Sequence, residues 1–312
     1  MIRVLFSAPK KDWDAYRSHL QKAFRSASLD VQIEHALSPD APDTVDYIIY
    51  APSSALQDFT PFTKVKLVQN LWAGVEEVID NPTLSQPLAR MVDDGLTAGM
   101  VEWCAGQVLR HHLGLDRQIG RTDGVWDPVV PPLARDRHVT ILGLGILGRQ
   151  VCAALTGLGF DVRGWSRSPR EVPGVTTFSG DDGLSLALTG AEIVVLLLPQ
   201  TAATESIMDM KRFAVLAEGA VLINPGRGPL VDDQALLDAL ASGQLSHATL
   251  DVFREEPLPS GHPFWAHEQI TVTPHIASVT RPSSAVDVIV ENIRRGEAGE
   301  PFLHLVDRAR GY

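Results

Sequence analysis

The chain has 312 residues, which is enough for about two domains, each with its own hydrophobic core. Hydrophobic residues make up 45% of the chain and charged residues 21%, so low complexity and extensive disorder are excluded. Because 38 Asp and Glu outnumber 27 Lys and Arg, the net charge is −11, which disfavours nucleic acid and anionic membranes as partners.

The sequence predicts no targeting segment and no membrane span. The chain opens with a short β-type run that ends at Ser7 and lacks the apolar region of a signal peptide. The longest apolar run, 193–198, is far shorter than the ~18 residues that a membrane span requires. Cys104 and Cys152 fall in predicted helices, where we expect buried, reduced thiols. These features predict a cytoplasmic protein.

Short apolar strands alternate with amphipathic helices in the N-terminal part, as in α/β proteins with parallel sheets. A helix is predicted over 12–24, where Trp13, Tyr16 and Leu20 recur at helical spacing, and a longer one over 100–113. The predicted strands of this part are 4–7, 31–35, 47–50, 67–69 and 90–92.

A second unit follows a turn-rich stretch and repeats the same alternation. Its last helix is predicted to begin at Pro282 and to end at Gly296, because glycine commonly ends helices. No strand follows this helix, so it could return to the first unit. The predicted strands of the second unit are 139–142, 161–165, 193–198, 220–224, 247–251 and 270–273.

A glycine-rich loop, GLGILG, joins a predicted strand to a predicted helix. Gly143 would make the tight turn, Gly145 would let a pyrophosphate approach the backbone, and Gly148 would let helix and strand pack closely. Ile146 and Leu147 open the helix, whose first N–H groups would bind phosphate. In this setting the motif predicts a dinucleotide site, although similar turns also occur without a ligand.

The end of the next strand indicates which dinucleotide binds. NAD-binding domains usually carry a carboxylate here, which would repel a 2′-phosphate. This chain instead has Ser166, Arg167 and Ser168, and a guanidinium flanked by hydroxyls can bind a 2′-phosphate through charge-assisted hydrogen bonds. The alternative is a solvated loop arginine. The segment therefore favours NADP(H), with NAD(H) as the second choice.

Charged side chains follow three later strands, at the edge where open α/β sheets build their sites. They are Arg227, Glu256 and His275. Reduction of a 2-keto acid needs a cation to bind the carboxylate and ketone and an acid to protonate the oxygen, roles that suit arginine and histidine. A carboxylate on the other imidazole nitrogen would orient the ring. Either Glu256 or Asp251 could supply it, and Asp251 could instead bind the nicotinamide carboxamide.

Four motifs resemble, in order and spacing, those of the D-2-hydroxyacid dehydrogenases: GLGILG, NPGRGPLVD, LDVFREEP and TPHIA. WSRS, the C-terminal VDRARGY and the length are similar to the members that reduce glyoxylate and hydroxypyruvate. The resemblance implies that Arg227 binds the substrate and that His275 is the acid and base. It also implies that Glu256, which directly precedes the proline, pairs with that histidine.

The resemblance implies two doubly wound parallel-sheet α/β domains with an active-site cleft between them. The flavodoxin-like substrate domain would be discontinuous, over 1–97 and 282–312, and the Rossmann-type nucleotide domain would span 98–281. A homodimer is also implied.

Further binding residues follow from the resemblance. The amides of Ala73 and Gly74 would hold the substrate carboxylate, and Trp72 beside them could restrict the pocket or simply pack. Other residues expected to line the cofactor are Leu198, Pro199, Thr204, Pro225, Gly226, Arg227, Asp251, His275 and Ala277.

No metal site is predicted. His111 and His112 are neighbours on a helix and point in different directions, so we expect them at the surface. The predicted function is NADPH-preferring reduction of glyoxylate to glycolate and of hydroxypyruvate to D-glycerate. The alternatives are a broad NAD(H)-dependent D-2-hydroxyacid dehydrogenase and a non-catalytic dinucleotide sensor on the same fold. Retention of Arg227, Glu256 and His275 together argues against the sensor.

Overall fold

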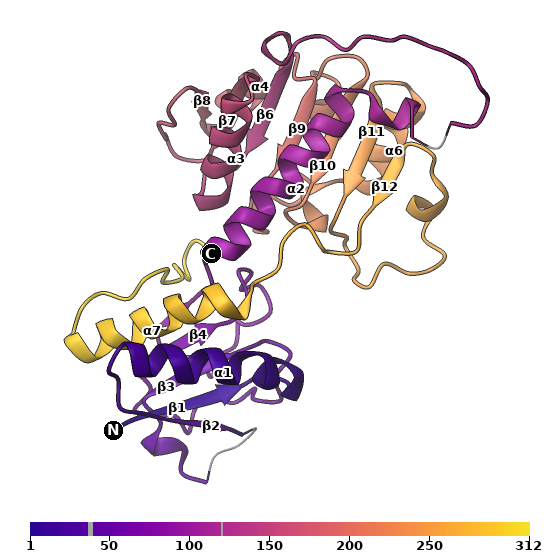
Figure 1. Cartoon of the computed structure of the whole chain (residues 1–312). Coiled ribbons are helices and arrows are strands. Elements are labelled where there is room, and N and C mark those ends of the chain that lie inside the picture. The colour runs from indigo at the N-terminus through magenta and orange to yellow at the C-terminus, as the bar shows by residue number, and fades with distance from the viewer. Residues whose placement is uncertain (37–39, 120) are drawn as a thin grey trace. The chain divides into compact units, whose positions relative to one another are not determined.

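The computed structural model describes residues 1–36, 40–119 and 121–312. The chain divides into two compact units, one of residues 1–96 and 279–312 and the other of residues 97–278 (Figure 1). Every strand pair in both sheets is parallel, and helices cover the sheets. The predicted architecture of two parallel-sheet α/β units is confirmed.

The first unit has a five-stranded sheet in the order β2-β1-β3-β4-β5, which is the flavodoxin-like order. The predicted strand over 90–92 is wrong. The backbone leaves the sheet there, because the Arg90 N–H donates to the His304 carbonyl and the Met91 N–H to the Trp72 carbonyl. The strands are β1 (Ile2–Ser7), β2 (Val31–His35), β3 (Tyr47–Tyr50), β4 (Leu67–Asn70) and β5 (Leu88–Ala89).

Two helices from opposite ends of the chain, α1 (Lys10–Ser26) and α7 (Pro282–Ala298), lie side by side in this unit (Figure 1). Leu20 of α1 and Ile289 of α7 pack in one buried cluster with Phe6 of β1. The last helix therefore returns to the first unit, and it buries one face of that sheet.

The predicted end of the last helix at Gly296 is wrong, since α7 continues to Ala298 and is followed by Gly299 with φ +70°. A Cβ at position 296 would overlap the Tyr47 hydroxyl. The glycine at 296 thus allows the helix to pack closely on β3, and Gly299 supplies the left-handed residue that ends the helix.

The second unit has a seven-stranded sheet in the order β12-β11-β10-β9-β6-β7-β8, in which the sequence order reverses between β6 and β9. Doubly wound sheets bind ligands beyond the carboxyl ends of their strands at such a reversal. The strands are β6 (His138–Leu142), β7 (Asp161–Ser166), β8 (Thr176–Ser179), β9 (Ile193–Leu196), β10 (Ala220–Asn224), β11 (Leu245–Leu250) and β12 (Ile270–Val272).

Helices cover both faces of this sheet. Ile193 of β9 belongs to the buried cluster with α2 and α3, whereas its neighbour Val194 belongs to the cluster with α4, α5 and α6. This alternation is what a strand buried on both faces requires. The helices are α2 (Asp94–His112), α3 (Ile146–Gly157), α4 (Gly180–Leu188), α5 (Met210–Phe213) and α6 (Asp233–Ala241).

The two cysteines are free and buried, as predicted. The surface prediction for His111 and His112 is wrong, because the last turn of α2 is covered on more than one side. His112 is 6% exposed and its ring packs edge-on against Phe160, while the His111 ring lies 5.0 Å from the ring of His247 on β11. Among the described residues, no helix is long and apolar enough to cross a membrane.

Candidate active site

The glycine loop after β6 has the geometry of a close strand–helix turn. Gly143 has φ +112°, a conformation that favours glycine, and a Cβ there would overlap the Leu197 carbonyl. A Cβ at Gly148 would overlap the Gly143 carbonyl. By contrast, a Cβ at Gly145 would meet no described atom within 4 Å. Two glycines therefore serve packing, and the third leaves open space beside the backbone.

The N-terminus of α3 begins beside that open space. Gly145 is the N-cap residue and is exposed, and it makes no side-chain hydrogen bond to the helix. Ile146 and Leu147 form the first helical positions. Among the residues that the structure describes, no side chain accepts from the first-turn N–H groups, which is the arrangement that binds phosphate at helix N-termini. These residues fit a dinucleotide pyrophosphate.

The segment after β7 ends the strand with no carboxylate. Arg167 and Ser168 are exposed, and the Ser166 hydroxyl donates to the Ser168 carbonyl at 2.8 Å. The hydroxyl of Ser166 thus closes the turn that presents Arg167. This arrangement of residues fits a phosphate better than it fits a pair of ribose hydroxyls.

The segment from Leu198 to Thr204 follows β9 and forms its own hydrogen-bonded loop. The Thr204 hydroxyl donates to the Pro199 carbonyl at 2.7 Å and accepts from the Thr201 N–H at 2.9 Å. Leu198 is buried. Two of the three residues predicted to contact the cofactor here therefore also set the shape of the loop.

Arg227 lies in a tight turn directly after β10. The Asn224 side chain shapes this turn, since its Nδ2 donates to the Arg227 carbonyl at 2.9 Å and its Oδ1 accepts from the Gly226 N–H at 3.1 Å. Pro225 and Gly226 are buried, and Nη1 of Arg227 donates to the Gly226 carbonyl at 2.7 Å. The turn therefore holds Arg227 at the carboxyl end of its strand.

His275 and Glu256 form a hydrogen-bonded pair at the same edge of the sheet. His275 Nδ1 lies 2.7 Å from Glu256 Oε2, and Glu256 Oε1 accepts from the Phe253 N–H at 2.8 Å. The side chain of His275 is 50% exposed, and within the described part of the chain its second ring nitrogen, Nε2, makes no hydrogen bond. The pair combines an imidazole with a carboxylate that fixes the ring orientation.

Asp251 anchors the backbone turn that carries His275. Its buried carboxylate accepts three hydrogen bonds, from the Thr273 hydroxyl at 2.5 Å, the Ile276 N–H at 2.9 Å and the Ala277 N–H at 2.8 Å. The His275 N–H donates to the Asp251 carbonyl at 2.8 Å. The sequence left Glu256 and Asp251 open as partners of the histidine ring. In the structure the ring bonds to Glu256, whereas Asp251 bonds to the backbone of the turn that carries His275.

In the first unit, Trp72, Ala73 and Gly74 form a turn directly after β4. The Asn70 side chain donates to the Trp72 carbonyl at 3.1 Å and to the Gly74 carbonyl at 2.8 Å. Within the described residues, the N–H groups of Ala73 and Gly74 have no intramolecular acceptor. Two adjacent backbone donors are therefore available to an anion.

Comparison with known families agrees with this geometry. Residues 104–277, more than half of the chain, match the model of the NAD-binding domain of D-isomer specific 2-hydroxyacid dehydrogenases. The chain belongs to the D-isomer specific 2-hydroxyacid dehydrogenase family. As a member of this family it is an NAD(P)-dependent oxidoreductase.

Individual relatives extend the match over almost the whole chain. Glyoxylate/hydroxypyruvate reductase A of Yersinia enterocolitica is 41% identical over 80% of this chain and 82% of that protein. A D-isomer specific 2-hydroxyacid dehydrogenase of Xanthobacter autotrophicus, solved with NADPH and MES, has a TM-score of 0.91 and 41% identity over 99% of each chain. An NADPH-dependent glyoxylate/hydroxypyruvate reductase of Sinorhizobium meliloti, solved with NADP and sulfate, has a TM-score of 0.85 and 31% identity over 100% of each chain.

Sequence reasoning missed two asparagines in this dehydrogenase. Asn70 and Asn224 each end a strand and fold the following turn through two side-chain hydrogen bonds. Asparagine at the end of an apolar strand is a local signal for such a turn. Both positions therefore could have been found as turn-forming residues.

Proposed function

We propose that the protein is an NADPH-preferring reductase of short 2-keto acids, converting glyoxylate to glycolate and hydroxypyruvate to D-glycerate. The observation that carries the proposal is the pair of His275 and Glu256, whose Nδ1 and Oε2 atoms lie 2.7 Å apart. The His275 ring is half-exposed. His275 follows β12, which lies beside β11 and two strands from β10, the strand that precedes the Arg227 turn. An acid and a fixed cation at one sheet edge match the needs of carbonyl reduction.

His275 supplies the proton in the proposed reaction. Glu256 accepts a hydrogen bond from Nδ1, so the proton on Nε2 is the one available to the ketone oxygen. NADPH, when bound, would supply a hydride to the C2 carbon, so that the carbonyl would become an alcohol. Arg227 binds the carboxylate and polarises the ketone, and the N–H groups of Ala73 and Gly74 bind the carboxylate oxygens.

The cofactor residues divide into three groups. The Gly145 backbone and the first turn of α3, in a loop shaped by Gly143 and Gly148, would hold the pyrophosphate, and Ser166, Arg167 and Ser168 would bind the 2′-phosphate. The remaining residues shape the walls of the nicotinamide site, namely Leu198, Pro199, Thr204, Pro225, Gly226, Asp251 and Ala277. The exposed Gly145 backbone and the carboxylate-free end of β7 support this division.

The experiment is a steady-state assay of glyoxylate, hydroxypyruvate and pyruvate with NADPH and with NADH. We expect substrate-dependent loss of NADPH with the first two acids and slower loss of NADH. If no short 2-keto acid causes oxidation of NADPH or of NADH, a dinucleotide sensor would be favoured instead.

Arg167→Asp tests the cofactor preference. Because charge-assisted hydrogen bonds contribute roughly 1.5–3 kcal/mol, the preference for NADPH over NADH should fall about tenfold or more. Lys211→Asp, an exposed position on α5 with the same change in charge, is the control and should leave the preference unchanged. An unchanged preference in Arg167→Asp would contradict the assignment.

The homodimer and the cytoplasmic location stay predictions. Exposed apolar side chains in the segment 121–133 support a contact with a second chain, since Trp126 is 92% and Val130 85% exposed.

A further inference from the structure

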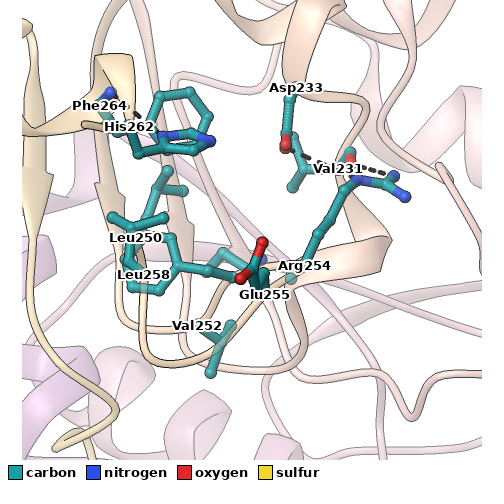
Figure 2. Close-up of a pocket in the computed structure, with 12 residues that line it drawn as sticks. Val231, Asp233, Leu250, Val252, Arg254, Glu255, Leu258, His262 and Phe264 are labelled. Carbon is teal, nitrogen blue, oxygen red and sulfur yellow. Dashed lines mark hydrogen bonds and ion pairs between the residues drawn. The ribbon is translucent and has the colours of Figure 1, made fainter. Parts of the chain in front are cut away.

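The loop after β11 carries Glu256 and, two residues earlier, Arg254, whose side chain makes several polar contacts. Arg254 Nη1 lies 2.7 Å from Glu205 Oε1, and Nη2 donates to the Val231 carbonyl at 2.6 Å and to the Ser206 hydroxyl at 3.0 Å. Its Nε lies 3.8 Å from Asp233 Oδ1. Figure 2 shows the side chain reaching from this loop towards Val231 and Asp233.

Packing fixes part of this loop, since Phe253 belongs to the buried core cluster and Leu258 packs against it. A cavity of about 150 Å³ lies behind it, between Arg254, Glu255 and Leu258 on the loop and Phe264 and His262 opposite (Figure 2). The twelve described residues that line the cavity do not include Arg227, Glu256 or His275. With space behind the rest of the loop, its position depends on polar contacts as well as on these packed side chains.

The loop position decides where the Glu256 carboxylate lies. Glu256 Oε1 accepts from the Phe253 N–H, and Oε2 bonds to His275, so a shift of the loop moves the carboxylate away from the ring. Phe253 itself rests against Gly228, where a Cβ would overlap the Phe253 carbonyl group. Beyond these packing contacts, Arg254 supplies the side-chain hydrogen bonds from this loop to the segments at 205–206 and 229–231.

The turn of Arg227 is held in a different way. The Asn224 side chain bonds to the Gly226 N–H and the Arg227 carbonyl, and these bonds do not involve Arg254. Arg254 donates instead to the carbonyls of Pro229 and Val231, which follow the turn. Loss of the Arg254 side chain should therefore loosen the Glu256 loop while the Arg227 turn keeps its shape.

We propose that Arg254 is a positioning residue for proton transfer: its guanidinium ties the Glu256 loop to the Val231 and Glu205 segments, which holds Glu256 against His275. This inference rests on the proposed function, because it requires His275 to be the acid. Arg254 itself need not touch substrate or cofactor.

The test is a double-mutant cycle of Arg254→Ala and His275→Ala, with kcat for glyoxylate, glyoxylate KM and the NADPH dissociation constant measured for each protein. In the wild-type background, Arg254→Ala should lower kcat about tenfold, because a small misplacement of a catalytic group is costly. Glyoxylate KM and NADPH affinity should change less than about twofold. In the His275→Ala background the loss in kcat should shrink to less than about twofold.

Two further variants separate positioning from general damage. In Arg254→Lys the lysine can reach the Val231 carbonyl but cannot span to Glu205 and Ser206. Its loss in kcat should therefore be smaller than that of Arg254→Ala, and it should again occur only in the background that keeps His275. Arg254→Lys also replaces Arg254→Ala if that protein does not fold. Arg212→Ala is the control, because Arg212 has the same exposed side-chain fraction of 37% but, within the described ranges, pairs locally with Asp209. It should keep wild-type kcat.

An equal loss in kcat from Arg254→Ala in both backgrounds, or an unchanged kcat in Arg254→Ala, would overturn the inference about Arg254. If His275→Ala alone still lowered kcat strongly, the proposed function would stand. Wild-type turnover in His275→Ala would overturn both.

Discussion

Two histidines in the second unit lie in contrasting surroundings. His275 follows β12, is half-exposed and bonds to a carboxylate through Nδ1 at 2.7 Å. His111 lies at the end of α2, where its Nε2 is 2.9 Å from Thr249 Oγ1 and its ring is 5.0 Å from that of His247. Burial, together with the neighbouring His247 and Arg110, lowers the pKa of His111 to about 3.

The difference between these histidines teaches what a general acid needs from its surroundings. A ring that exchanges protons with a substrate requires a partner that fixes its orientation and a nitrogen that the substrate can reach. His275 bonds to Glu256 through Nδ1 and is half-exposed. His111 bonds to Thr249 and packs against His247, and burial lowers its pKa so far that the ring remains neutral at physiological pH. The residue type alone does not distinguish His275 from His111 as a general acid, whereas the packing around each ring does.

The largest expected effect separates these two environments directly. His275→Ala should lower kcat for glyoxylate by about 10²-fold or more, because general acid catalysis contributes roughly 10²–10⁴-fold. His247→Ala, which removes a histidine from the buried contact, is the matched control and should change kcat less than about twofold. Equal losses in the two variants would erase the distinction between the environments.

A smaller effect should follow from the carboxylate beneath the His275 turn. Asp251→Asn places an amide where the carboxylate accepts three hydrogen bonds, so one donor must face another donor. We expect a loss of about 1–3 kcal/mol in the free energy of unfolding, and a roughly tenfold lower kcat as the turn shifts.

Urea unfolding and steady-state rates check this prediction, with Asp209→Asn as the control at a partly exposed helix cap. A destabilised Asp251→Asn protein with wild-type kcat would show that the position of His275 does not depend on this anchor.

The smallest effect concerns the buried histidines and pH. The pKa of His111 is about 3 in the folded chain, below its ordinary value of 6.5, and burial also lowers the pKa of His247. The unfolded chain therefore binds more protons below pH 6.5, and stability is lost as the pH falls from there towards 3. Near neutral pH His111 is uncharged in both the folded and the unfolded chain, so this loss of stability is absent.

His111→Gln should flatten this pH dependence, since glutamine can bond to Thr249 without titrating. The measurement is the unfolding midpoint of wild type and variant between about pH 8 and about pH 5. Parallel curves for the two proteins would contradict the account of His111, and kcat should be unchanged in either case.

Much of the fold could be predicted because the information is local. Apolar runs such as 220–224 end where polar turn residues begin, and the observed β10 has the same bounds. The short helices α4, α5 and α6 were missed, since four to nine residues give little periodicity. Gly296 and His112 were misjudged because the Tyr47 hydroxyl and the Phe160 ring that contact them are far away in sequence.

The candidate site shows the same division. The glycine loop and the strand ends that carry Arg227, Glu256 and His275 follow from local motifs. The bonds that arrange them do not, because Asp251 reaches residues 22 to 26 positions away and Arg254 reaches residues 23 to 49 positions away. Such contacts depend on which strands become neighbours in the sheet.

The most direct test of the central claim follows the hydride itself. Glyoxylate is incubated with the protein and NADPH that carries deuterium at the transferred position of the nicotinamide, and the product is analysed by mass spectrometry. The account predicts glycolate with one deuterium on C2, formed rapidly by the wild type and by His247→Ala but slowly by His275→Ala. Absence of deuterated glycolate, or its formation at the wild-type rate in His275→Ala, would contradict it.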